Sequence, residues 1–229
     1  MAQPKQLSCV IFDVDGTLTN TNNLIFETFN HVARAHLGRA FSPEEIIGLF
    51  GPPEEGAVEK IFGRDRTPQI MDELCAFYRD NHSSLARLHE GMDDALRILK
   101  GAGIKLAVFT GKGRRTAALT LDAFGIKDYF EMVVTGNDVV NHKPDGEGIT
   151  RILESLGVSA EETLMVGDSM ADVRASRQAG VAMAAVLWDA YDRQKMLGAG
   201  SELVFETVPA FLEWCKRQAN GRIQPSRHA

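Results

Sequence analysis

The sequence of 229 residues has few of the features that mark membrane, disulfide-rich or nucleic-acid-binding proteins. Its three cysteines are widely separated and form no CxxC pair, which argues against a disulfide framework and a cysteine zinc site. The longest apolar runs, such as Val181–Trp188, are far too short to cross a bilayer, and the N-terminus lacks a signal-peptide pattern. A net charge of −6, with no stripe of lysine and arginine, disfavours nucleic acid as a partner. We therefore expect a cytoplasmic protein that acts on small molecules and binds neither membrane nor nucleic acid.

Apolar, β-favouring runs alternate with helical segments along most of the chain. Five runs are predicted to form buried strands of a parallel sheet: Ser8–Phe12, Ile104–Thr110, Phe130–Thr135, Thr163–Asp168 and Val181–Leu187. Three helical segments between them end at Gly125, Gly157 and Gly180, where a helix needs a left-handed residue. The alternation predicts a doubly wound α/β fold, in which helices cover both faces of a parallel sheet.

Residues 20–88 follow a different pattern, because no buried strand is evident and amphipathic helices succeed one another. The first helix is predicted over Asn22–Leu37. A second begins at Ser42, where the sequence SPEE combines a capping serine, a proline in the first turn and a glutamate that completes a capping box. We predict a core domain of residues 1–19 and 89–229, with a helical cap domain of residues 20–88 inserted after the first strand.

Charged and hydroxyl side chains gather where the predicted strands end. Asp13 and Asp15 follow the first strand, and further polar residues follow the later ones: Thr110, Lys143, Asp168 and Asp172. In a parallel sheet these ends meet at one edge, where ligands bind. The four carboxylates and one lysine leave a formal charge of about −3 in a small volume, which Coulomb repulsion disfavours. A divalent cation would offset most of this charge, and carboxylate oxygens beside a phosphate favour Mg²⁺.

The two aspartates after the first strand suit phosphoryl transfer. A carboxylate held against phosphorus can attack it and form an acyl phosphate, which divides a difficult hydrolysis into two easier steps. We assign the role of nucleophile to Asp13. Asp15, two residues further along an extended chain, points to the same side and would protonate the leaving group and then deprotonate water. The phosphate is expected to lie against Gly16, Thr110, Gly111 and Lys143.

Four segments resemble, in order and spacing, the motifs of the haloacid dehalogenase superfamily: DVDGTL, VFTGK, HKPDG and GDSMAD. The chain resembles most the phosphoglycolate-phosphatase-like branch, whose helical cap follows the first motif. The resemblance implies that Asp13 is the nucleophile, that Asp15 is the acid and base, and that Mg²⁺ is held by Asp13, the Asp15 carbonyl and Asp168. The resemblance also implies that Thr110 and Lys143 bind phosphate. It implies that Asp172 supports either the metal or Lys143 without binding the substrate itself.

These motifs leave the substrate open. The resemblance implies a Mg²⁺-dependent phosphatase acting on a small phosphorylated metabolite, with phosphoglycolate as the leading candidate. TLTNTN and the FGPP turn at Phe50–Pro53 instead resemble members that hydrolyse inorganic diphosphate. Gly51, in that turn, and Lys112 are further candidates for contact with the substrate. A phosphosugar mutase and, outside the enzymes, a phospho-accepting switch are alternative interpretations, although Asp15 and the inserted helices count against a switch. Both a monomer and a homodimer fit the sequence.

Overall fold

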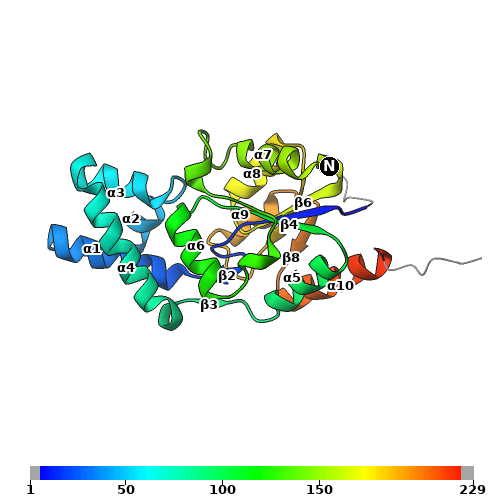
Figure 1. The fold of residues 1–229 in the computed structure, drawn as a ribbon, viewed down its shortest axis with the longest axis horizontal. Coiled ribbons are helices and arrows are strands. Elements are labelled where there is room, and N and C mark those ends of the chain that lie inside the picture. The colour runs from blue at the N-terminus through cyan, green and yellow to red at the C-terminus, as the bar shows by residue number, and fades with distance from the viewer. Residues whose placement is uncertain (1–5, 223–229) are drawn as a thin grey trace, which may run out of the picture.

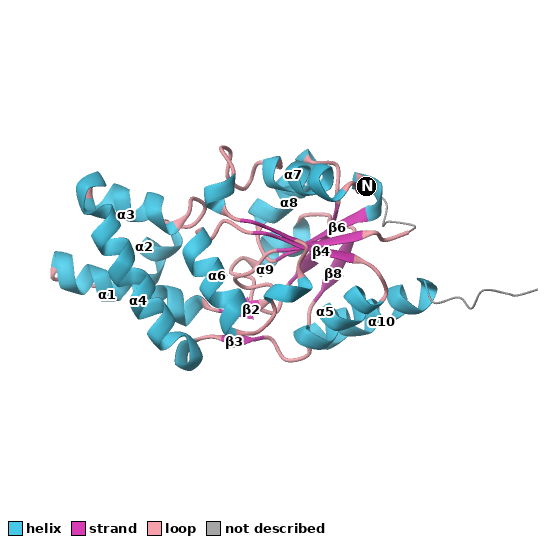
Figure 2. Cartoon of the chain, in the orientation of Figure 1, coloured by secondary structure: helices cyan, strands magenta, loops and turns pink. Residues whose placement is uncertain are grey.

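A six-stranded parallel sheet forms the centre of the computed structural model, which describes residues 6–222 (Figure 2). The strands, in their order across the sheet, are β5 (Met132–Val134), β4 (Lys105–Phe109), β1 (Cys9–Phe12), β6 (Thr163–Gly167), β7 (Ala182–Val186) and β8 (Leu203–Phe205). The chain moves outward from β1 in two directions, through β4 and β5 on one side and through β6, β7 and β8 on the other. This order confirms the predicted doubly wound sheet and adds β8, which the sequence pattern did not predict.

Helices cover both faces of the sheet. Successive residues of the central strand point to opposite faces, and since all of them are apolar, both faces must be covered. Val10 and Phe12 of β1 belong to one buried hydrophobic cluster, and Cys9 and Ile11 to another. Helices α5 (Met92–Gly101) and α10 (Val208–Arg222) contribute to the first cluster and cover one face of the sheet. Helices α7 (Glu147–Leu156) and α8 (Met170–Gln178) contribute to the second cluster and cover the other face (Figure 1). Burial on both faces explains why the strands appear in the sequence as unbroken apolar runs.

Residues 20–88, which we call the helical segment, lie at one end of the molecule, on the left of Figure 1. Its helices are α1 (Asn22–Leu37), α2 (Pro43–Ile47), α3 (Glu54–Phe62) and α4 (Thr67–Leu85). They share a hydrophobic cluster of their own, to which Phe29 and Ile70 belong. The predicted capping box at α2 is present, since Glu45 N donates to Ser42 Oγ over 3.2 Å and Ser42 N donates to Glu45 Oε2 over 2.8 Å.

The chain enters and leaves the helical segment through a short antiparallel pair, β2 (Thr19–Asn20) and β3 (Arg87–Leu88). The sequence pattern did not predict this pair, because two residues carry no detectable periodicity. The remaining helices are α6 (Arg114–Ala123) and α9 (Arg193–Gly198), with short 3₁₀ turns at Arg64–Arg66, Lys127–Tyr129, Gly136–Asp138 and Ala160–Glu162. No helix in residues 6–222 is both long and apolar enough to span a bilayer.

Close packing of α7 against β4 gives a test of the fold. A methyl group added at Gly148 would lie 2.1 Å from Cε2 of the buried Phe109 ring. We expect Gly148→Ala to lower the free energy of unfolding by about 1–3 kcal/mol, because the ring must move within a packed core. The matched control is Gly101→Ala in α5, where a methyl group meets no atom within 4 Å. Urea denaturation of both variants measures the effect, and equal stability of the two would contradict the packing described here.

Candidate active site

The two aspartates that follow β1 have different lysine partners. Asp13 lies beside Lys143, with its Oδ1 3.2 Å from the lysine Nζ. Asp15 lies beside Lys112, whose Nζ is 3.2 Å and 3.1 Å from the two carboxylate oxygens. Asp15 Oδ1 also accepts a hydrogen bond of 2.5 Å from Thr21 Oγ1, at the start of the helical segment. Both aspartates line the same cavity, so two carboxylates with separate partners face one space.

Lys143 connects the loop before α7 to two aspartates. Its Nζ donates to Asp172 Oδ1 over 2.5 Å, in addition to its ion pair with Asp13, and it lies 4.8 Å from the centre of the Phe109 ring. Burial alone would lower the pKa of Lys143, but the charges of Asp13 and Asp172 outweigh burial and raise that pKa above its ordinary value. Lys143 therefore brings a positive charge to the floor of the cavity.

Asp172 is completely buried and has a structural role at the start of α8. Its Oδ2 accepts hydrogen bonds from Ser169 N at 3.1 Å and from Ser169 Oγ at 2.6 Å, which closes a capping box. A methyl group at Gly167 would lie 2.4 Å from Asp172 Cγ, so glycine is needed for this close approach. Of the two partners expected for Asp172, a metal or Lys143, the structure places it against Lys143.

Asp168 follows β6 and is held by the loop after β1. Thr17 Oγ1 donates to Asp168 Oδ1 over 2.9 Å. Gly16 has a φ of 79°, which favours glycine, and a methyl group there would lie 2.3 Å from Asp168 Oδ2. Gly16 thus allows the loop to pass close to Asp168. It does not line the cavity, unlike the other residues expected beside the phosphate.

Three carboxylates form a group that suits a cation: Asp13, Asp168 and Asp172 place oxygens within 4.8 Å of one another. Asp13 Oδ1 is buried, and its partner among the described residues is the ammonium group of Lys143, at 3.2 Å. An all-oxygen donor set fits a hard divalent cation such as Mg²⁺. Asp172 is already engaged by Lys143 and Ser169, which leaves Asp13 and Asp168 as the side chains best placed to bind it.

Two of these carboxylates, Asp13 and Asp168, have a raised pKa. Burial raises the pKa of Asp13 to about 6; Lys143 opposes the rise, and the charges of Asp172 and Asp15 add to it. Burial, followed by the charges of Asp13 and Asp172, raises the pKa of Asp168 well above its ordinary value. A nearby cation would favour the charged form of both groups. A cation held by these two aspartates would therefore oppose the effect of burial on their charge.

The loop after β4 meets the helical segment at the cavity. Thr110 is buried, and its Oγ1 accepts a hydrogen bond of 3.2 Å from Lys112 N. A methyl group at Gly111 would lie 3.0 Å from the carbonyl oxygen of Gly51, so the two backbones approach closely. The structure thus brings five of the six predicted substrate contacts to one cavity: Thr110, Gly111, Lys143, Lys112 and Gly51.

Glu54, in the first turn of α3, was not predicted to belong to the site, because a glutamate there has an ordinary role at a helix N-terminus. Its carboxylate accepts hydrogen bonds from Gly113 N at 2.5 Å and from Thr116 Oγ1 at 2.6 Å. It also lies 3.8 Å from Lys112 Nζ. Glu54 therefore joins the helical segment to the start of α6. Its only sequence signal is its place directly after the Gly-Pro-Pro turn.

Lys112 is enclosed by its partners, with 1% of its side chain exposed. Besides Asp15 and Glu54, the Tyr78 ring lies 4.8 Å from its Nζ. Burial would lower the pKa of Lys112, but the surrounding acidic groups raise it far above its ordinary value. Lys112 was a candidate for contact with the substrate; in the structure its ammonium group pairs with Asp15.

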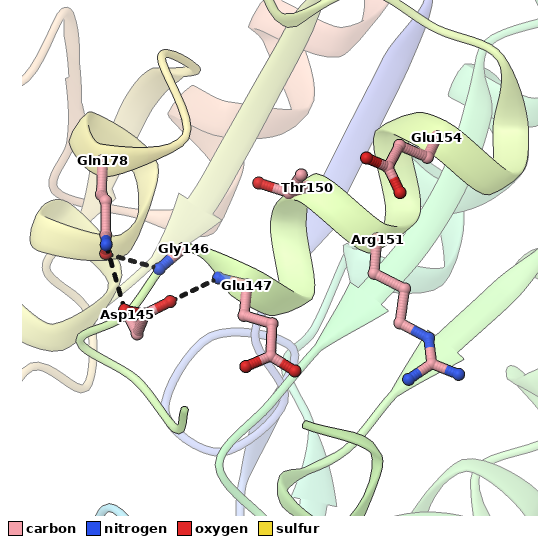
Figure 3. A pocket seen from close by; sticks show the side chains of 7 residues that line it. All are labelled: Asp145, Gly146, Glu147, Thr150, Arg151, Glu154 and Gln178. Atoms are coloured by element: carbon pink, nitrogen blue, oxygen red, sulfur yellow. Dashed lines mark hydrogen bonds between the residues drawn. The ribbon is translucent and has the colours of Figure 1, made fainter. Parts of the chain in front are cut away.

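The cavity between the sheet edge and the helical segment has a volume of about 390 Å³, within the range of small-molecule sites. Its charged lining consists of Asp13, Asp15, Glu54, Lys112, Lys143 and Asp168. Asn22 and Tyr191 also line it, and neither was predicted. A second hollow, of about 550 Å³, lies between α7 and Gln178 of α8 (Figure 3). Gln178 bonds there to Asp145 and Gly146, and none of the predicted site residues lines it.

A family model described as haloacid dehalogenase-like hydrolase matches residues 10–186, which span the β1 aspartates, Lys143 and Asp168. The chain belongs to the haloacid dehalogenase-like hydrolases. Within that family it is similar to proteins named pyrophosphatase PpaX. The one from Halalkalibacterium halodurans is 31% identical over 212 residues, 91% of this chain and 96% of that protein. The one from Anoxybacillus flavithermus is 32% identical over 206 residues, 90% of this chain and 95% of that protein.

The fold of this hydrolase also resembles that of a crystal structure from Haemophilus somnus 129pt, described as a predicted phosphoglycolate phosphatase. The match has a TM-score of 0.79 and covers 92% of this chain and 98% of that chain. At 22% identity it shows a shared fold.

The raised pKa of Asp13 predicts a pH dependence of stability for the metal-free hydrolase. The pKa rises from 3.8 to about 6 on folding, so between these values the folded state holds a proton that the unfolded chain has released. The contribution of Asp13 to the free energy of unfolding therefore falls as pH rises through this window, by about 3 kcal/mol. Asparagine does not titrate, so wild type should lose stability relative to Asp13→Asn over the same window.

Urea denaturation in EDTA, from about pH 4 to pH 7, measures this difference. Asp122→Asn in α6 is the control; because this aspartate is exposed, its variant should follow wild type. A difference between wild type and Asp13→Asn that stays constant, or that grows in the opposite direction, would contradict the burial argument.

Proposed function

We propose that the protein is a Mg²⁺-dependent phosphatase that hydrolyses a small phosphomonoester through a phosphorylated Asp13. The observation that carries the proposal is the pair Asp13 and Asp15, which open onto one cavity with separate lysine partners. Two carboxylates in different surroundings can take different roles in one reaction. Membership of the haloacid dehalogenase-like hydrolases supports a hydrolytic reaction.

The proposed reaction has two displacements at phosphorus. In the first, a carboxylate oxygen of Asp13 bonds to phosphorus, the bond from phosphorus to the leaving oxygen breaks, and Asp15 gives its proton to that oxygen. In the second, Asp15 takes a proton from water, the water oxygen bonds to phosphorus, and the acyl phosphate bond to Asp13 breaks. Inorganic phosphate leaves, and both aspartates return to their starting forms.

The groups around Asp13 would stabilise the transferred phosphoryl group. Lys143 supplies positive charge, while Thr110 and the amide of Gly111 supply hydrogen-bond donors. Asp13, Asp168 and the carbonyl of Asp15 would hold Mg²⁺, which when bound supplies further positive charge beside the phosphoryl oxygens. Asp172 would keep Lys143 in place without touching the substrate.

We also propose that the helical segment acts as a cap over a core of residues 1–19 and 89–229. The support for this is the contact of Glu54 with Gly113 and Thr116, and that of Thr21 with Asp15. A cap closed over the site excludes water from the acyl phosphate until the leaving group departs.

Inorganic diphosphate is a second candidate substrate. It is favoured by the name of the relatives that are 31% and 32% identical, and by the Gly51-Pro52 turn at the cavity. Phosphoglycolate has the support of a structural neighbour's description, at 22% identity. Both compounds would release an anionic leaving group.

Variants of the two aspartates test the mechanism. With acetyl phosphate, whose leaving group needs no proton, Asp13→Asn should form no phosphoprotein and Asp15→Asn should accumulate it, because water then lacks its base. With phenyl phosphate, Asp15→Asn should lower kcat by about 10²- to 10⁴-fold. Mass spectrometry after acid quench and a phosphate-release assay give the two readouts. Asp122→Asn should match wild type, and normal turnover by Asp13→Asn would refute the mechanism.

Metal binding is testable without activity. Mg²⁺ should raise the melting temperature of wild type, since a ligand held only by the folded state stabilises it by about 2.7 kcal/mol at a hundredfold excess over Kd. Asp168→Asn should remove this rise. Its stability in EDTA should equal or exceed that of wild type, because the pKa of Asp168 shows that burial disfavours its charge. A full Mg²⁺ response in Asp168→Asn would place the metal elsewhere.

A further inference from the structure

The part of the cavity formed by the helical segment is apolar. Six apolar residues line it there: Ile25, Phe29, Leu49, Phe50, Pro52 and Ala57. The helical segment adds two polar side chains, the neutral Asn22 and the acidic Glu54. Among the described residues that line the cavity, the only cations are Lys112 and Lys143, and both come from the other side. The helical segment thus offers a leaving group apolar contacts and no positive charge.

The two lysines are committed to other partners. Lys143 lies between Asp13 and Asp172, at 3.2 Å and 2.5 Å. Lys112 is 3.1 Å from Asp15 and 3.8 Å from Glu54, and only 1% of its side chain is exposed. A second anionic group that paired with one of these lysines would weaken its contact with a carboxylate that is fully buried, as Asp172 is, or partly buried, as Asp15 is. A carboxylate left unpaired in such surroundings is costly.

The charge balance of the cavity leads to the same result. Its lining holds four carboxylates, Asp13, Asp15, Glu54 and Asp168, and two lysines, so its formal charge is −2 with every carboxylate ionised and −1 when Asp15 carries the proton that it gives to the leaving group. One Mg²⁺ and a phosphoryl dianion carry equal and opposite charges, so together they would leave this negative total unchanged. A carboxylate or a second phosphate would add negative charge with no further cation in the lining. An uncharged leaving group would add none.

We infer that the substrate's leaving group is an uncharged alcohol with an apolar body, seated against the helical segment. The inference rests on the proposed function and narrows its substrate class, against both diphosphate and phosphoglycolate. Phe29 and Ile25 form the buried part of this seat, at 4% and 8% exposure. Phe50 from the helical segment and Tyr191 from the other side, with ring centres 6.0 Å apart, form its more exposed part.

The first test compares two esters that differ only in charge, benzyl phosphate and 4-carboxybenzyl phosphate, together with phosphoglycolate and diphosphate. With Mg²⁺ present, kcat/KM for benzyl phosphate should exceed that for its carboxylated analogue by about tenfold or more. It should also exceed the values for phosphoglycolate and diphosphate. A preference for any of the three anionic compounds over benzyl phosphate would overturn the inference.

A second test introduces the missing cation. Phe50→Arg places a positive charge at the cavity and should reduce the preference for benzyl over 4-carboxybenzyl phosphate by about tenfold. Ile47→Arg is the matched control. Ile47 is an apolar residue of the helical segment that is 38% exposed, against 39% for Phe50, and it does not line the cavity. The preference should be unchanged in this control. An unchanged preference in Phe50→Arg as well would overturn the placement of the leaving group.

Acetyl phosphate separates failure of the inference from failure of the proposed function. If wild type hydrolyses acetyl phosphate with Mg²⁺ but prefers the carboxylated ester, only the inference is wrong. If it releases phosphate from none of these compounds, the proposed function is wrong and the inference falls with it.

Discussion

Ion pairing at the carboxyl edge of the sheet is the constraint on which the rest of the structure depends. Lys143 binds Asp13 and Asp172, and Lys112 binds Asp15, all within a largely buried region. Removing one partner of such a pair leaves an unpaired charge, which typically costs about 3–5 kcal/mol when the pair is buried. The charges come from loops after different strands, so the sheet must hold these loops in one arrangement. The long apolar strands and their packing on both faces provide that rigidity.

The sequence predicted the sheet well because strands buried on both faces leave a strong pattern. It missed β8 (Leu203–Phe205), which has three residues, one of them the exposed Val204, and therefore shows no clear run. The meeting of Asp13, Asp15 and Asp168 followed from topology alone, because parallel strands end at one edge. Glu54 was missed for a physical reason. Its contacts are with residues about 60 positions away, and nothing local distinguishes it from any glutamate that begins a helix.

The helical segment and the catalytic edge are connected through charge as well as packing. Glu54 contacts the start of α6 and lies near Lys112, which in turn pairs with Asp15. Thr21, where the chain enters the helical segment, bonds to the same aspartate. Asp15 is thus held by groups whose positions depend on where the helical segment sits. A movement of that segment would change the surroundings of Asp15 more than those of Asp13, whose lysine partner belongs to the core.

In the proposed function, the cavity would recognise two parts of a substrate separately. The sheet edge supplies carboxylates, lysines and backbone donors suited to a phosphoryl group, and these come from the four motifs that define the chemistry. The helical segment supplies Ile25, Phe29 and Phe50, which line the cavity and would contact the leaving group attached to the phosphoryl group. A change in these few side chains would alter the substrate without disturbing the ion pairs at the sheet edge. Relatives about one-third identical to this chain are therefore a better guide to its chemistry than to its substrate, since a few side chains can change the substrate while the fold and the reaction type stay the same.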